Sequence, residues 1–316
     1  MKSHFSIKRS LFLYLLLLGI LPSAKAQTDL DYDMMAKKLF CSGFTYSYSG
    51  WDQYWEGTFK RDNKNLGKVT TQMIGYMGNY GVSKKLNILF NIPYVFTKAS
   101  AGTLAGMQGM QDLSLFVKWK PLSFKLGKGS MALYGVGGIS TPLSDYTADY
   151  LPLSIGLESQ SVLGRVIADY QLGHFFVTGS GTYIIRNNID IDRDAYYTTE
   201  MHLTNEVEMP NAASFNFRTG FRGKQLIAEA VINNWTTLGG FDITKNNMPF
   251  PSNKMNMTTA GIKFRLEPKT LPNLSLHAEG NYTIAGRNVG QAYSFMGGAF
   301  YILNFNRKTS SSSKTN

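Results

Sequence analysis

The chain has 316 residues, of which 43% are hydrophobic, 13% aromatic and 17% charged, and its formal net charge is +11 at pH 7. A single cysteine excludes an internal disulfide framework, and a mean hydropathy of −0.16 excludes a bundle of membrane helices. The positive charge is not gathered in a patch of the kind that binds nucleic acid, so no nucleic-acid partner is expected.

The first 26 residues predict a secretory signal peptide. Basic residues precede an apolar run at 11–21, and a small-residue cleavage site follows at 24–26. Cleavage would remove four bases and no acid, which lowers the net charge from +11 to about +7. We expect the mature chain to have a short periplasmic segment at 27–39, a barrel domain at 40–305 and a polar periplasmic tail at 306–316.

The run at 162–172 shows the pattern that repeats along the mature chain. Its even positions, among them Val162 and Val166, are apolar, whereas its odd positions include Arg165 and Asp169. Successive side chains of a strand point to opposite faces, so one face is apolar and the other polar. A soluble sandwich buries the apolar face in its core, whereas an outer-membrane barrel turns that face to lipid.

We expect about twelve such strands, an even number as in bacterial single-chain barrels. On the fourth strand, for example, Leu115 and Val117 share one face, and Lys118 and Lys120 share the other. The twelve expected strands lie at 40–51, 69–80, 86–96, 112–121, 131–141, 162–172, 175–186, 213–222, 225–235, 256–266, 274–284 and 293–305.

The connections between these strands alternate in length. Short turns are expected at 81–85, 173–174 and 223–224, with slightly longer ones between the fourth and fifth and between the tenth and eleventh strands. Long polar loops are expected at 98–111, 142–161, 187–212 and 236–255. Membrane barrels have short periplasmic turns and long extracellular loops, so the alternation favours a barrel over a sandwich.

The predicted fold is therefore all-β: a transmembrane antiparallel up-and-down β-barrel in the outer membrane of a Gram-negative bacterium. Both termini are expected in the periplasm, and outer-membrane lipid and lipopolysaccharide are the expected surroundings. On the last strand, Tyr301, Leu303 and Phe305 share one face, which resembles the terminal strand that the barrel assembly machinery recognises. That machinery is therefore an expected partner, although a tail of eleven residues follows here.

Several segments in the first half of the chain together resemble a known family. At 80–94 a tight turn leads into a strand that ends in Ile-Pro-Tyr, and at 109–119 a strand begins with Gly-x-x-Asp. A Thr-Pro-Leu-Ser-Asp-Tyr element lies within 140–156, and a Tyr-x-x-Arg ending lies at 183–186. In this order they are similar to the outer-membrane family associated with the meta-pathway of phenol degradation, a relative of the long-chain fatty-acid transporter barrels. The resemblance implies a barrel that passes small hydrophobic or aromatic molecules. Fatty-acid transporters have an N-terminal plug, and the segment before the first strand is too short for a hatch of that kind.

Turning the apolar faces to lipid assigns a set of strand residues to the lumen, in which basic residues outnumber acids. One interpretation is a mildly cationic pore that favours anionic solutes. The other is that bases and acids pair across strands and fill the lumen, with Arg218 or Arg222 next to Glu229 and Lys263 next to Glu279; a twelve-stranded barrel permits either. The predicted lumen residues are Lys118, Lys120, Arg165, Asp169, Arg186, Arg218, Arg222, Glu229, Lys263, Arg265, His277 and Glu279.

The sequence predicts no enzyme, cofactor or metal site. The mature chain has three histidines, His174, His202 and His277, and no serine is placed by the sequence to complete a catalytic triad. The acidic loop after 187 departs from a calcium-binding loop because Ala195 stands where that loop requires glycine. The expected function is a channel or transporter for small molecules, hydrophobic or aromatic ones among them. The alternative is a barrel without transport that has a structural or surface role.

Overall fold

The computed structural model describes residues 34–245 and 247–305, so the predicted signal peptide, most of the segment before the first strand and the polar tail lie outside the described residues. Twelve long strands make up its main sheet: β1 (Leu39–Trp51), β4 (Val69–Gly81), β5 (Leu86–Ala99), β7 (Asp112–Leu126), β8 (Gly129–Pro142), β9 (Ser161–Leu172), β10 (Phe175–Arg186), β15 (Ala212–Arg222), β16 (Leu226–Thr237), β17 (Asn256–Leu266), β18 (Leu274–Arg287) and β19 (Tyr293–Asn304). Within the described residues, no helix is long and apolar enough to cross a membrane.

Each long strand pairs antiparallel with its neighbours in the chain, and the last strand pairs with the first. The β1–β19 ladder runs from Leu39 opposite Asn304 to Gly50 opposite Tyr293 and closes the ring. A thirteenth strand of this sheet, β6 (Gln108–Met110), pairs only with β5. The predicted all-β, up-and-down barrel of twelve strands is confirmed.

The two faces of the barrel wall have opposite polarity. Outward-facing side chains are apolar and exposed, such as Phe44 at 62% and Val166 at 65%, while inward-facing Thr45, Arg218 and Asp169 are buried. A soluble sandwich would expose its polar face and bury its apolar one. Apolar outside and polar inside is the arrangement of a barrel that lies in lipid.

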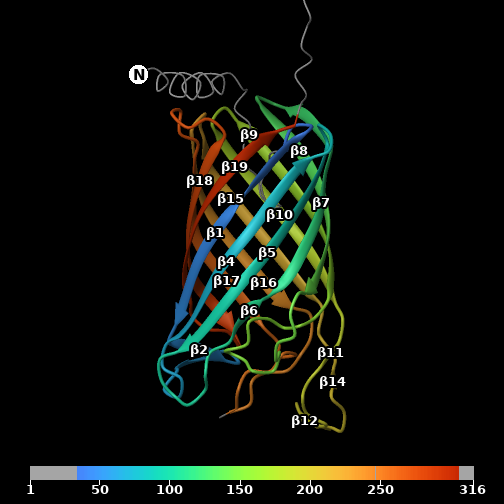
Figure 1. Ribbon diagram of the computed structural model, residues 1–316, viewed down its shortest axis with the longest axis vertical. Coiled ribbons are helices and arrows are strands. Elements are labelled where there is room, and N and C mark those ends of the chain that lie inside the picture. Colours follow the sequence, from blue (N-terminus) through green and yellow to red (C-terminus); the bar gives the residue numbers. More distant parts are fainter. Residues whose placement is uncertain (1–33, 246, 306–316) are drawn as a thin grey trace, which may run out of the picture.

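Loop lengths differ between the two ends of the barrel. Figure 1 shows tight turns at the end where β1 begins and β19 finishes, here called the turn end, and long loops at the opposite end, here called the loop end. Two residues join β9 to β10 and two join β7 to β8, and Gly173 and Gly127 in these turns have φ angles of 60° and 59°. Glycine adopts this left-handed backbone without strain, which permits such short turns.

The hairpin of β7 and β8 is longer than the sequence predicts. The expected strands at 112–121 and 131–141 are in fact joined by a two-residue turn, because β7 continues to Leu126 and β8 begins at Gly129. The expected range stops at Pro121, and proline cannot donate a ladder hydrogen bond. The ladder shifts register between Trp119 and Leu122, so Pro121 lies in a bulge that requires no such bond.

The long loops contain short strand pairs that periodicity does not predict. They are β2 (Gln53–Glu56) with β3 (Phe59–Asp62), β11 (Ile189–Asp190) with β14 (Glu206–Val207), and β12 (Tyr196–Tyr197) with β13 (Met201–His202). The loops at 187–211 and 238–255 share one apolar cluster, which includes Ile189, Tyr196, Val207, Met209 and Phe250. The loop end is therefore a folded layer rather than a set of separate solvated loops.

Candidate functional site

The chain that leads into β1 enters the barrel at the turn end. Met35 is only 1% exposed and packs with Leu39, Cys41, Phe300 and Ile302 on the inner faces of β1 and β19. Met34 packs against a separate cluster of Tyr134, Val136 and Ile167 on β8 and β9, which are distant from β1 around the ring. The contacts of Met34 and Met35 reach both of these sides of the ring, so these two residues extend across the lumen and narrow it.

A buried ionic cluster joins three neighbouring strands near the turn end. Both terminal nitrogens of Arg222 on β15 donate to the Asp169 carboxylate on β9, at 3.0 and 2.7 Å. The same guanidinium donates to the hydroxyl of Thr178 on β10 at 3.1 Å and lies 3.5 Å from the centre of the Phe176 ring. All four side chains are at most 4% exposed. The charge of Arg222 is thus held by a carboxylate, a hydroxyl and a ring face.

A second charged row continues across the next strands. Arg218 on β15 lies 3.5 Å from the Glu229 carboxylate on β16. Glu229 stands opposite Lys263 on β17, and Lys263 stands opposite Glu279 on β18. Glu229, Lys263 and Glu279 therefore alternate acid and base in register, and Arg218 reaches Glu229 diagonally, because Gly220 is the residue opposite Glu229. Of the two arginines considered as partners of Glu229, Arg218 is the one that pairs with it, whereas Arg222 pairs with Asp169.

Two predicted lumen lysines lie on β7. Lys118 is 0% exposed, and its ammonium group lies 5.6 Å from the centre of the Tyr134 ring on β8. Tyr134 belongs to the cluster that Met34 contacts, so this cation lies close to an apolar surface. Lys120, two residues nearer the turn end, is half-buried.

Two predicted lumen arginines bind neutral partners. Arg165 on β9 donates from Nε to the hydroxyl of Thr182 on β10 at 2.7 Å. Arg186, at the end of β10, donates from Nε to the Pro210 carbonyl at 2.7 Å, and its guanidinium lies 5.8 Å from the centre of the Trp235 ring. Arg186 therefore fastens the 187–211 loop to the barrel rim at the loop end.

His277 has a polar neighbour that the sequence analysis missed. Its Nε2 lies 3.0 Å from Ser275 Oγ on the same strand face, and its ring centre lies 4.8 Å from that of Phe300. The two-residue spacing on one strand could have revealed this pair. Ser275 is 1% exposed, so no substrate reaches its hydroxyl in this arrangement. On the neighbouring strand, Arg265 lies opposite His277, with its Nε 3.7 Å from the Glu267 carboxylate.

The inner face of the barrel therefore has two unlike parts. We call the first the apolar wall; it consists of two separate clusters, one of Met35, Leu39, Cys41, Phe300 and Ile302 and the other of Met34, Tyr134, Val136 and Ile167. We call the second the charged wall; it consists of Asp169, Arg218, Arg222, Glu229, Lys263, Arg265 and Glu279. Met34 and Glu279 are half-buried and the other residues of both walls are buried, so the lumen is tightly filled at this level.

At the loop end, the connection between β8 and β9 folds against the inner wall. Leu153 is fully buried beside Leu66 and Val69, and the hydroxyl of Thr97 donates to the Leu153 carbonyl at 2.5 Å. Ile155 packs with Val95 and other side chains of that wall. This inward-folded loop narrows the loop end, as the methionines narrow the turn end.

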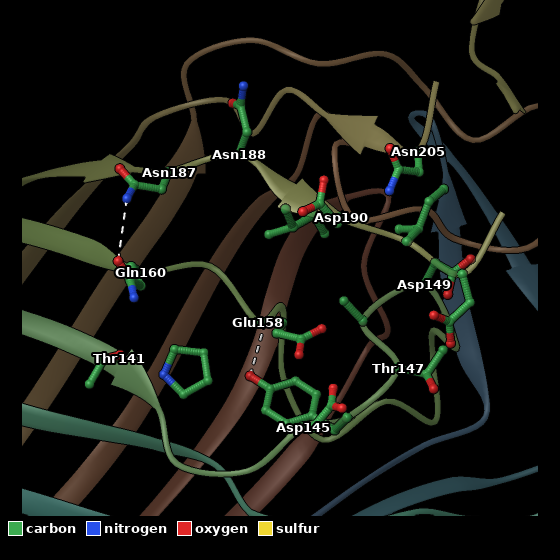
Figure 2. A pocket seen from close by; sticks show the side chains of 16 residues that line it. Thr141, Asp145, Thr147, Asp149, Glu158, Gln160, Asn187, Asn188, Asp190 and Asn205 are labelled. Atoms are coloured by element: carbon green, nitrogen blue, oxygen red, sulfur yellow. Dashed lines mark hydrogen bonds between the residues drawn. The ribbon is translucent and has the colours of Figure 1, made fainter. Parts of the chain in front are cut away.

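A polar cavity of about 690 Å³ lies between the 143–160 and 187–205 segments of the loop end, and Figure 2 shows its lining. Tyr146 supports its floor by donating to the Asp112 carboxylate at 2.7 Å and accepting from the Glu158 backbone N–H at 2.9 Å. Burial and the neighbouring Asp145 carboxylate raise the pKa of Glu158. The acidic residues of its lining are Asp145, Asp149, Glu158, Asp190 and Asp192.

The carboxylates of this cavity favour cationic solutes, and the carboxamides of its Asn and Gln side chains can form hydrogen bonds with a solute. Among the residues that the structure describes, no group of three or more His, Cys, Asp or Glu side chains has an arrangement that could hold a metal ion. The acidic composition of 187–212 predicts a polar external loop but not this cavity, because the lining joins segments that are distant in the chain.

Comparison with known proteins places this barrel among outer-membrane folds. It is similar to an outer membrane channel from Pseudomonas putida F1, with a TM-score of 0.70, 14% identity, and coverage of 88% of this chain and 100% of that chain. The translocator domain of the autotransporter NalP from Neisseria meningitidis is a more distant likeness, with a TM-score of 0.45, 11% identity, and coverage of 93% and 94%. No protein-family model and no curated protein sequence matches the chain. The likeness to the first of these structures shows a shared fold, that of an outer-membrane β-barrel.

Proposed function

We propose that the protein is an outer-membrane channel or transporter for small molecules, and that it prefers hydrophobic or aromatic molecules that carry an acidic group. The observation that carries the proposal is the two-part lumen. The apolar wall would accommodate a ring or short hydrocarbon, while the bases beside it would favour a carboxylate. Lys118 lies where the two properties meet, since its ammonium group is adjacent to Tyr134 of the apolar wall.

Two further considerations support this solute class. The resemblance to the family of the phenol meta-pathway implies small aromatic molecules, and the barrel has the fold of an outer membrane channel. The acidic cavity at the loop end favours cations, so the bases deeper in the lumen would have to decide selectivity at the narrowest level.

Because Met34 and Met35 narrow the turn end of the lumen, we propose that transport requires these two side chains to leave their positions. Met34→Ser with Met35→Ser should then increase uptake, since both side chains would lose their apolar contacts. An equal uptake rate in the variant and the wild type would contradict this gating role.

The test is uptake by proteoliposomes of three matched solutes: benzoate, benzyl alcohol and benzylammonium. We expect benzoate to enter fastest. Lys118→Met keeps the side-chain length but removes the charge, so it should reduce benzoate uptake and leave benzyl alcohol unchanged. Lys224→Met, at an exposed lysine in the β15–β16 turn, is the matched control and should change neither. Faster entry of benzylammonium than benzoate would refute the electrostatic preference.

The second candidate is a barrel that does not transport. It is favoured by the tight filling of the lumen, in which Lys118, Ile167 and Thr178 are each 0% exposed. No uptake of any of the three solutes, by the wild type or by the double serine variant, would support this candidate over the first.

A further inference from the structure

Lysines gather on one side of the turn end. They come from three places: the segment before β1, the β4–β5 turn and the β7–β8 hairpin, which neighbour one another around the ring. Six of the seven side chains are exposed, and one, that of Lys120, is half-buried. We call this set the lysine sector; it consists of Lys37, Lys38, Lys84, Lys85, Lys120, Lys125 and Lys128.

No acidic residue of the same strands compensates this charge. The sequence has no Asp or Glu at 34–51, 63–111 or 113–144, which include β1, β4 and β5, all of β7 except its first residue, and β8. The loop end is different, because Lys60 and Lys64 lie in the same loop as Asp52, Glu56 and Asp62. Among the residues that the structure describes, the lysine sector is therefore a patch of one sign, whereas the lysines of the loop end are interspersed with acids.

The β7–β8 hairpin places a lipid-facing apolar surface next to the lysine sector. The last pair between β5 and β7 is Leu86 opposite Trp119, so β7 continues towards its turn without β5 beside it. Along this extension, Leu122, Phe124 and Leu126 are 54%, 47% and 51% exposed. Exposed apolar side chains next to lysines are typical of the boundary between the hydrocarbon core and the lipid headgroups. At this boundary the aliphatic part of a lysine lies along apolar surface, and its ammonium group reaches the lipid phosphate.

We propose that the lysine sector is a docking surface for anionic phospholipid headgroups of the periplasmic leaflet. Charge complementarity and continuity with the lipid-facing wall support this occupant over a soluble one: the same hairpin presents three apolar side chains to the bilayer, with Lys125 between the last two of them and Lys128 in the turn. The proposal rests on the membrane setting of the proposed function, with the turn end in the periplasm, and does not require transport.

The test compares full-length barrels in nanodiscs of phosphatidylcholine that contain a minor fraction of phosphatidylglycerol. One variant is K84Q/K85Q/K125Q/K128Q. The matched control is K60Q/K64Q/K245Q/K254Q, which removes four exposed lysines from the loop end. Native mass spectrometry then counts the phosphatidylglycerol molecules retained by each barrel. A third variant, K84R/K85R/K125R/K128R, keeps the charge and shows whether charge alone matters.

The wild type should retain phosphatidylglycerol above its share of the bilayer, and the excess should fall as salt is raised. The glutamine variant should lose roughly fivefold or more of this enrichment, because one lysine near an anionic surface is worth about fivefold in binding. The loop-end control and the arginine variant should keep it. Equal retention by both glutamine variants would overturn the proposal, as would capture of polyglutamate from solution with no lipid preference. Solute uptake is measured separately on the same samples, so a failed transport function and a failed lipid surface give different results.

Discussion

Arg222 illustrates how a charge is kept inside this barrel. An isolated ion in a dry interior is unfavourable by several kcal/mol, and attraction to a partner offsets this only when the geometry is good. Arg222 has the Asp169 carboxylate on one edge, the Thr178 hydroxyl beside it and the Phe176 ring across its face. The arginine therefore contributes to stability only together with its partners, and the partners depend equally on it.

Arg222→Met should destabilise the barrel by about 3–5 kcal/mol, because it leaves the Asp169 carboxylate buried without its cation. Arg222→Met combined with Asp169→Leu removes both charges and should recover most of the loss. Urea unfolding in lipid vesicles, followed by tryptophan fluorescence, measures both values. A double variant no more stable than Arg222→Met alone would show that the pairing is not the source of the effect.

The loss of stability caused by an arginine on the outer face of the barrel should depend on how deep that position lies in the bilayer. Val166 is 65% exposed in the middle of β9, and Phe175 is 69% exposed at the turn end of β10. Val166→Arg should cost about 2–4 kcal/mol, as expected near the bilayer midplane, while Phe175→Arg should cost about 0–1 kcal/mol from charge. Equal losses in vesicle unfolding titrations would mean that the outer face does not cross a membrane at these levels.

At the scale of elements, the inward-folded loop between β8 and β9 should respond to pH through Glu158. Burial and the Asp145 carboxylate raise its pKa above the ordinary value of 4.5. The folded loop then favours the neutral acid, so its stability is greatest below the ordinary pKa and falls as pH rises through the raised value. Hydrogen exchange at 143–160, corrected for intrinsic rates, should show falling protection over this window. Glu158→Gln should abolish the fall, and an unchanged pH profile in that variant would contradict the assignment.

The sequence predicts a strand well only where apolar and polar residues alternate over enough positions to define a period. Alternation of apolar and polar residues is clear in β9, and both β9 and β10 match their predicted ranges to within one residue. It fails at Pro121, where a bulge lets β7 continue to Leu126. The strands β11 to β14 are two residues each, too short for any period to register. The Asp169–Arg222 pair was also missed, because its members lie on strands that are not neighbours.

Across the whole molecule, the two ends differ in loop length, and this difference sets the expected orientation. The 187–211 loop and its short strands belong to the loop end, whereas Gly223 and Lys224 form part of a turn at the opposite end. Membrane barrels place long loops outside and short turns in the periplasm. Protease added to intact cells should therefore cut within 187–211 and spare Lys224. Permeabilised cells are the control for access to the turn, and cleavage at Lys224 in intact cells would reverse the orientation.

The ladder between β1 and β19 also determines the order in which the barrel can be completed. Leu39 and Asn304 lie at opposite ends of the barrel sequence, so this seam is the strand pairing of longest range and we expect it to form last. Until then, the curved sheet has two unsatisfied edges whose hydrogen-bonding groups match each other. A second unfinished copy offers the same edges in the same register. A high concentration of chains before insertion would therefore favour dimers in which two open sheets pair edge to edge. Dilution, or a chaperone bound to the unfinished chain, would favour closure of each sheet on itself.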